Sequence, residues 1–205
     1  MYYRHWQNEE TRKSVLGGIR DPQNAAGWNR FYELYAGYIY SIARSRGLSD
    51  ADADDVVSAV MTSIVEGIGK YDPARGRFRG WLYNLTAWRV NDVFRSKSRT
   101  REIPLAPEDM PVVASDEPVV DDEAEWAGAV NEEALRRLKA VTSPTHFAVF
   151  HASVFEELDV ESIKNLYGVT RDNIYQIKKR VKAEFTGILA AVAREMESPA
   201  LPRAS

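Results

Sequence analysis

The residues best suited to chemistry lie between Arg79 and Arg99, where indoles, amides and guanidinium groups recur at helical spacing. An α-helix turns by about 100° per residue, so one stripe would hold Trp81, Asn84, Trp88, Asn91 and Arg95. The aliphatic residues fall mostly on the other side: Leu82, Leu85, Val90 and Val93. Flat aromatic surface beside hydrogen-bonding and cationic groups is what a protein needs to hold unpaired nucleic-acid bases. On this stretch alone, tryptophans that pack against a neighbouring helix are an equally good interpretation.

A second motif, from Asp159 to Phe185, predicts a short helix, a tight turn at Gly168 and a longer helix capped by Thr170. An apolar stripe follows the longer helix: Ile174, Ile177, Val181 and Phe185. Polar side chains point away from it: Arg171, Asp172, Tyr175, Gln176, Lys179 and Lys182. Such a face suits the DNA major groove, where Arg and Gln read base edges and Lys holds phosphate. An ordinary amphipathic hairpin with a hydrated basic face is the alternative.

The elements that would position these groups are all helical, and the predicted fold class is all-α with two small helical domains. Helices are expected at about Ser14–Arg20 and Asn24–Arg46, and from Ser49 to the glycines at 67 and 69. A loop over Lys70–Gly80 follows, and another helix begins at Trp81. Two more helices are expected at about Trp126–Ala140 and Ser143–Glu157. Between Thr100 and Asp122 the chain has four prolines, many acids and no helical period, which predicts a linker.

Charge is segregated although the net charge of the 205 residues is only −3. Lys and Arg outnumber the acidic residues from Lys70 to Arg101 and again after Thr170, whereas the charged residues of Glu102–Glu133 are all acidic. The acidic segment can compete with DNA for the basic surfaces, so we expect the free chain to bind DNA poorly.

Several classes of function are disfavoured. The chain has no cysteine, which excludes disulfides and thiolate metal sites. His5, His146 and His151 lack ligand spacing, and no glycine-rich phosphate loop or nucleophile motif is present. We therefore predict no catalytic residue, no metal and no cofactor. Neither a signal peptide nor a bilayer-spanning apolar run is visible, which predicts a cytoplasmic protein without membrane insertion.

The ordered set of motifs resembles the extracytoplasmic-function (ECF) sigma factors, initiation subunits of bacterial RNA polymerase within the sigma-70 family. The similar segments are "DADADDVVSAV", "YDPARGRFRGWLYNLTAWRVNDVFR" and the helix-turn-helix with "NIYQIKKRV". The resemblance implies region 2 over residues 1–100, an acidic linker over 101–124, a region 4 helix-turn-helix over 125–196 and a disordered tail over 197–205.

The resemblance also implies roles for matching positions. Contact with core RNA polymerase would involve Asp52, Asp55, Val56 and Ala59. Recognition and opening of the promoter minus-ten element would involve Tyr71, Arg75, Arg77, Arg79, Trp81, Asn84, Trp88, Asn91 and Arg95, with the Tyr71–Phe78 loop capturing a flipped base. The alternative role for Tyr71 and for Phe78 is to anchor that loop to the core. The minus-thirty-five element would be read by Thr170, Arg171, Asp172, Tyr175, Gln176, Lys178, Lys179 and Lys182.

The sequence departs from the family pattern at two places. Trp88 stands where many members have Asn, which bears on the preferred base, and Ser58–Ala59 replaces Gln-Glu, which bears on the polymerase contact. Ser58 and Thr62 are one turn apart, so phosphorylation could restore negative charge there. Partners are therefore core polymerase and promoter DNA, with an anti-sigma factor or a regulatory kinase as further candidates.

Two other functions stay open from the residues. One is a helix-turn-helix regulator that works without polymerase, and it predicts a dimer and tight operator binding. The other is an enzyme acting on nucleic acid through carboxylates such as Asp52 and Asp54, although a helix N-terminus favours acids anyway.

Overall fold

The computed structural model describes residues 15–21, 23–72, 77–98 and 122–197, and the predicted linker lies almost wholly outside them. The described residues form only helices and connecting turns, as the all-α prediction requires. They divide into two compact units, the first made of Met1–Ala129 with Glu195–Ser205 and the second of Val130–Arg194. None of the described helices is long and apolar enough to cross a membrane.

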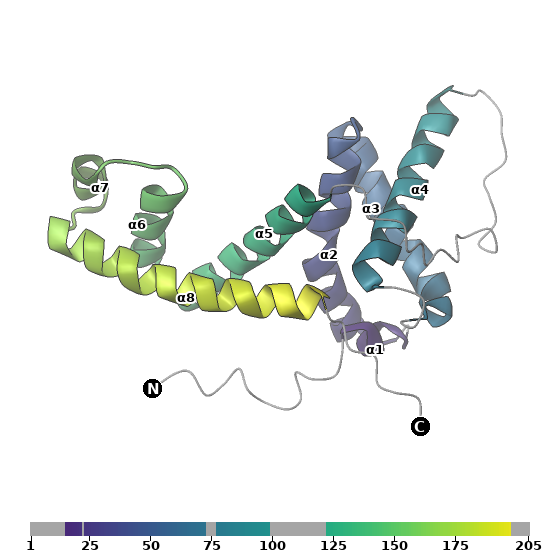
Figure 1. Ribbon diagram of the computed structural model, residues 1–205, viewed down its shortest axis with the longest axis horizontal. Coiled ribbons are helices and arrows are strands. Elements are labelled where there is room, and N and C mark those ends of the chain that lie inside the picture. The colour runs from purple at the N-terminus through teal and green to yellow at the C-terminus, as the bar shows by residue number, and fades with distance from the viewer. Residues whose placement is uncertain (1–14, 22, 73–76, 99–121, 198–205) are drawn as a thin grey trace. The chain divides into compact units, whose positions relative to one another are not determined.

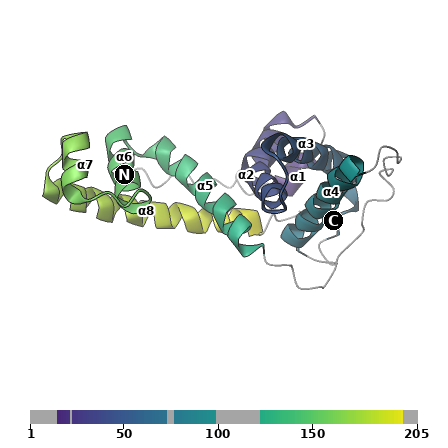
Figure 2. The same ribbon diagram turned by 90° about the horizontal axis from the view of Figure 1, so that it is seen from above.

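The first unit is built on four helices that pack together, α1 (Val15–Ile19), α2 (Ala25–Ser45), α3 (Asp50–Gly67) and α4 (Phe78–Ser98), with a short 3₁₀ turn, η2 (Ile68–Lys70), after α3 (Figures 1 and 2). Their shared core is aromatic and aliphatic, and its fully buried side chains include Phe31, Tyr35, Ile39, Ile64 and Leu82. The core thereby fixes which side of α4 faces outward.

Side-chain caps set where α2 and α3 begin. The Asn24 side chain accepts a hydrogen bond from the Gly27 amide at 3.0 Å, and Ser49 accepts one from the Asp52 amide at 3.2 Å. Gly47 ends the turn after α2 with a φ of 89°, a backbone conformation that favours glycine. The predicted starts of both helices are confirmed, and α2 ends one residue before the expected Arg46.

Helix α4 begins earlier than expected, at Phe78 and not at Trp81. The Phe78 ring is 2% exposed and lies edge-on to Phe31 and Tyr35, at centroid distances of 6.0 and 5.3 Å. Burial of this ring draws the first turn of α4 onto the core. Phe78 packs on the core, as an anchor for the preceding loop would, and residues 73–76 of that loop lie outside the described residues. Arg79 belongs to the helix and not to the loop.

The second unit contains most of α5 (Glu123–Val141) and of α8 (Arg171–Glu197), with α6 (Pro144–Val154) and α7 (Val160–Tyr167) between them. Leu138, Phe150, Ile163 and Ile177 are among the residues of its core. Helix α6 ends at Val154, so its expected extent to Glu157 was wrong. Glu157 has a φ of 53°, which a right-handed helix does not allow, and the Leu158 amide turns back to the Ala152 carbonyl at 2.9 Å.

The short helix, turn and long helix predicted after Asp159 are present. Asp159 caps α7 by accepting hydrogen bonds from the amides of Glu161 and Ser162, at 2.9 and 3.0 Å. Gly168 ends α7 with a φ of 63°. Helix α8 then continues through Glu197 with Met196 fully buried.

Candidate nucleic-acid interface

The predicted stripe of α4 lies at the surface of the first unit. Trp81, Asn84 and Trp88 are half-buried, and Asn91 and Arg95 are exposed. Of the aliphatic residues, Leu82, Leu85 and Val90 are buried and Val93 is half-buried. Helix α4 therefore has the two unlike faces that its sequence predicts, and part of each tryptophan is accessible at the surface.

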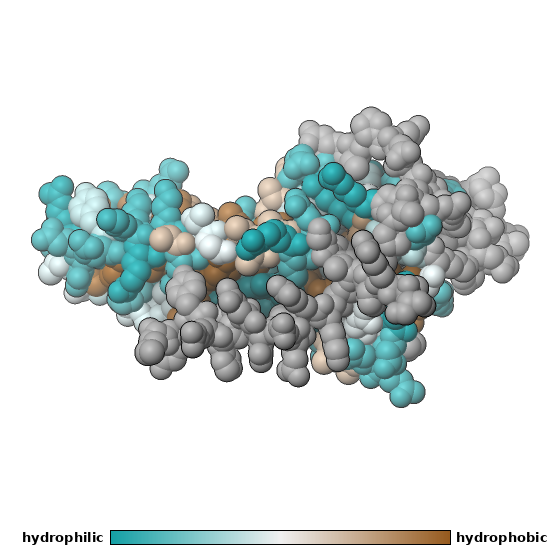
Figure 3. Space-filling model, turned by 60° about the horizontal axis from the view of Figure 1, so that its bottom comes forward, coloured by the Kyte–Doolittle hydropathy of each residue, from teal (hydrophilic) through white to brown (hydrophobic). Residues whose placement is uncertain are grey.

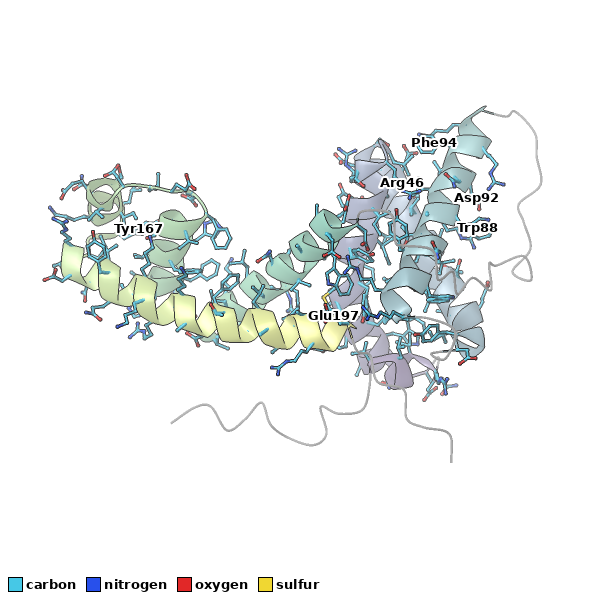
Figure 4. The ribbon with its side chains drawn as sticks, in the orientation of Figure 1. Arg46, Trp88, Asp92, Phe94, Tyr167 and Glu197 are labelled. Carbon is cyan, nitrogen blue, oxygen red and sulfur yellow. The ribbon has the colours of Figure 1, made fainter. Side chains whose placement is uncertain are left out.

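Trp88 is held by its neighbour on α4. The Arg89 guanidinium carbon lies 4.5 Å from the centre of the Trp88 ring, a cation–π contact. Arg89 is itself fixed to α3, because its Nε and Nη2 donate to the Ser63 hydroxyl at 3.0 and 2.6 Å. Figure 4 marks Trp88 on α4, with Asp92 one turn further along the same helix. The indole is thus positioned before any ligand binds.

Three aromatic rings meet where η2 leads into α4. The Trp81 ring lies 5.5 Å from both the Tyr71 and the Phe78 rings, measured between centroids. Tyr71 is half-buried, and burial, together with the nearby Asp72 charge, raises the pKa of its hydroxyl, which stays protonated at neutral pH. The structure therefore brings Tyr71 and Trp81 together into one aromatic corner. Arg77 is exposed beside it, and Arg75 lies outside the described residues.

Arg79 is not displayed like the other predicted cations. Its Nε and Nη2 donate to the two carboxylate oxygens of Asp122, at 3.0 and 2.5 Å. The Trp126 ring covers the guanidinium, with 4.6 Å from carbon to centroid, and only 17% of the Arg79 side chain is exposed. In this structure the guanidinium is already occupied by a carboxylate.

The predicted polymerase contact lies at the start of α3. Asp55 is exposed and Ala59 is half-buried, but Val56 is 1% exposed, so its side chain belongs to the core and not to an outer surface. Asp52 accepts a hydrogen bond from Lys97 Nζ at 2.5 Å and another from the Ser49 hydroxyl, and these two partners lower the pKa of its carboxyl. Asp52 thus ties α3 to the end of α4.

The hydroxyls considered for phosphorylation are accessible. Ser58 and Thr62 are exposed on α3, and the Thr62 hydroxyl donates to the Ser58 carbonyl at 3.0 Å.

The second candidate surface is the outward face of α8. Ile174, Ile177 and Val181 are at most 4% exposed, whereas the opposite face is exposed at Thr170, Arg171, Asp172, Tyr175, Gln176, Lys179 and Lys182, with Lys178 half-buried. Thr170 accepts from the Asn173 amide at 3.3 Å, and the Arg171 guanidinium lies 5.9 Å from the Tyr175 ring. The part of the second unit formed by α7 and the start of α8 is mainly hydrophilic on the face drawn in Figure 3.

Comparison with protein families identifies the first unit. Residues 31–100, which cover most of α2 and all of α3 and α4, match the family described as Sigma-70 region 2. The match covers 70 of the 205 residues, and we call this part of the first unit the region 2 domain. Comparisons with curated proteins and with solved structures gave no match.

Among the described residues no cluster of carboxylates and histidines is arranged to hold a metal ion.

Sequence reasoning missed two groups of residues at this domain. Asp122, Tyr38 and Trp126 meet around Arg79, although no sequence pattern gives them a role at the site, and Ser63 accepts the hydrogen bonds of Arg89. Contacts between residues far apart in the sequence leave no local pattern. The one sequence feature that pointed to this site is Trp126, a single tryptophan after the acidic segment.

Proposed function

We propose that the chain is a sigma factor of the ECF type that directs core RNA polymerase to promoters and opens them. The observation that carries the proposal is the outward stripe of α4 within the region 2 domain. Aromatic side chains there can stack on unpaired bases, and the neighbouring amides and Arg95 can hold the strand. Such a factor works in the cytoplasm, where its polymerase and promoter are.

In this proposal the two surfaces have separate tasks. The aromatic corner of Tyr71 and Trp81, with Trp88 on the next turns, receives a base flipped from the minus-ten element, and Arg77 lies near the strand. The exposed acids at the start of α3, Asp55 above all, contact the polymerase. The outward face of α8 reads the minus-thirty-five element as region 4.

Support for the region 4 assignment comes from the chemistry of that face. Its Arg, Gln and Lys side chains are exposed along the first turns of a helix that follows a tight turn, which is the arrangement of a recognition helix. Replacement of Lys179 by Ala should reduce the salt dependence of promoter binding by about one counterion, and replacement of Gln176 should change sequence preference instead.

The decisive experiment is run-off transcription with purified core polymerase and genomic promoter fragments. Initiation that depends on the added chain supports the proposal, and its absence would refute it. Trp81→Ala or Tyr71→Ala should impair transcription from a duplex promoter and spare a promoter opened in advance by mismatches. Equal losses on both templates would contradict the strand-holding role.

The same fragments separate this function from that of a self-sufficient regulator. A chain that retards specific DNA tightly as a dimer, without polymerase, would favour the regulator. The region 2 domain favours the sigma factor.

A further inference from the structure

A buried carboxylate occupies the Arg79 side chain of the region 2 domain. Asp122 is 2% exposed, and it receives both hydrogen bonds from Arg79 and a third from the Tyr38 hydroxyl of α2. Trp126, one turn into α5, covers the Arg79 guanidinium and lies edge-on to the Tyr38 ring with centroids 5.0 Å apart. Exposed Glu123 adds a weaker contact to Arg79 at 3.2 Å.

The donors around Asp122 make a site for any anion with two oxygens. An Arg side chain binds carboxylate and phosphate through the same pair of parallel hydrogen bonds. The Tyr38 hydroxyl is neutral and donates, because burial and the neighbouring Asp122 raise its pKa. A phosphodiester of DNA could therefore take the place of the Asp122 carboxylate.

Helix α2, which carries Tyr38, also holds the end of α8. Arg30 donates to the Glu195 carboxylate from its Nε and Nη2, at 3.0 and 2.7 Å, and the Tyr35 hydroxyl donates to the Met196 carbonyl at 3.1 Å. Both segments that flank the second unit in sequence thus belong to the first unit. Asp122 is part of this attachment, and its release is the step that would free Arg79.

We infer that Arg79 and Tyr38 form a phosphate site for single-stranded DNA, and that Asp122 fills this site in the free chain as a built-in competitor. The inference rests on the proposed function, because it takes the opened strand as the competing anion. Arg79 lies in the first turn of α4, the helix that also carries the base-holding stripe. While Asp122 and Trp126 stay in place, the Asp122 carboxylate accepts from Nε and Nη2 of the guanidinium and the Trp126 ring covers its face.

A purely structural ion pair makes the opposite prediction. Loss of the carboxylate would then leave a poorly paired buried cation, and the domain would lose stability without gaining any affinity for DNA.

The test uses the full chain without polymerase and a fluorescein-labelled, mixed-sequence single-stranded oligonucleotide. Asp122→Asn keeps the size of the side chain and removes its charge. We expect the Kd from fluorescence anisotropy to fall about tenfold, because the competing carboxylate is gone. Amide hydrogen exchange should rise in residues 122–129 at the same time.

Three further variants isolate the site. Glu125→Gln removes the same charge from the first turn of α5, where no contact with Arg79 is recorded, and should change the Kd far less. In the double variant Arg79→Ala/Asp122→Asn the gain should vanish, since the freed guanidinium is what binds. Trp126→Ala should also tighten binding, which keeps the test informative if Asp122→Asn proves poorly folded.

Three results would overturn the inference: equal affinity in Asp122→Asn and Glu125→Gln, a gain that survives loss of Arg79, or faster exchange in 122–129 without tighter binding. Failure of the sigma function looks different. A chain that follows the expected affinities but supports no run-off transcription would leave this site standing and refute the proposed function.

Discussion

Replacement of Trp88 by Ala separates base holding from folding. In the structure Trp88 is half-buried, and its recorded ring contact is the Arg89 guanidinium at 4.5 Å. The cation–π contact contributes about 0.5–1 kcal/mol and the buried part of the indole about 1.5–3 kcal/mol, less than the 5–15 kcal/mol by which a typical domain is stable. The variant should therefore remain folded, with a lower thermal unfolding midpoint than the wild type.

The effect on DNA should be larger. Stacking of one base on an aromatic side chain is worth about 1–3 kcal/mol, which corresponds to a factor of about 5 to 150 in the opening equilibrium. We expect a loss within that range in heparin-resistant open complexes on a duplex promoter. A template that already contains a mismatched bubble should lose much less, because its opening no longer depends on base capture.

Phe94→Ala is the matched control. Phe94 is an aromatic residue on the same helix, marked with Trp88 in Figure 4, and is 42% exposed. Helical spacing puts it on another side of α4 from Trp81 and Trp88. Its replacement should leave open complexes unchanged. If Phe94→Ala and Trp88→Ala reduced them equally, or if Trp88→Ala had no effect on the duplex template, the stacking argument would be wrong.

Three further predictions concern stability. A Cβ at Gly27 would lie 2.8 Å from the Gly18 backbone, so Gly27→Ala should destabilise the chain by about 1–3 kcal/mol in denaturant unfolding. Gly187 lies in open space within α8, so Gly187→Ala should stabilise the chain by about 0.5–1 kcal/mol. A change of the same sign in both variants would contradict the close packing of α1 on α2. Glu157→Gly should raise stability by about 1 kcal/mol by relieving the positive φ, and Glu157→Ala, which also lacks the charge, should not. Hydrogen bonds from Ser162 and Glu161 lower the pKa of Asp159. Its contribution to folding stability is therefore present at neutral pH and is lost as the pH falls below about 4 through the depressed folded-state pKa. Asp159→Asn still caps α7 and should lose less stability in acid, as measured by calorimetry, and an unchanged pH profile of stability would refute this.

Local patterns were enough for much of the architecture and for the two candidate surfaces. Helix starts at Asn24, Ser49 and Asp159 could be predicted because a capping side chain bonds to an amide two or three residues away. The outward faces of α4 and α8 followed from helical periodicity, since burial of one side of a helix exposes the other. The sequence could not show that Phe78 begins α4, because that depends on ring contacts with a helix formed by distant residues.

What the sequence determined by itself was the pair of amphipathic helices that present aromatic and basic groups, because spacing within one helix fixes which side chains share a face. What only the tertiary structure decided was the state of Arg79. Its charge and position in the sequence are those that we expect of a DNA-binding residue, but Asp122, Tyr38 and Trp126 reach it from other elements. A buried ion pair forms between residues far apart in the chain, and only the packing of α2, α4 and the start of α5 determines that they meet.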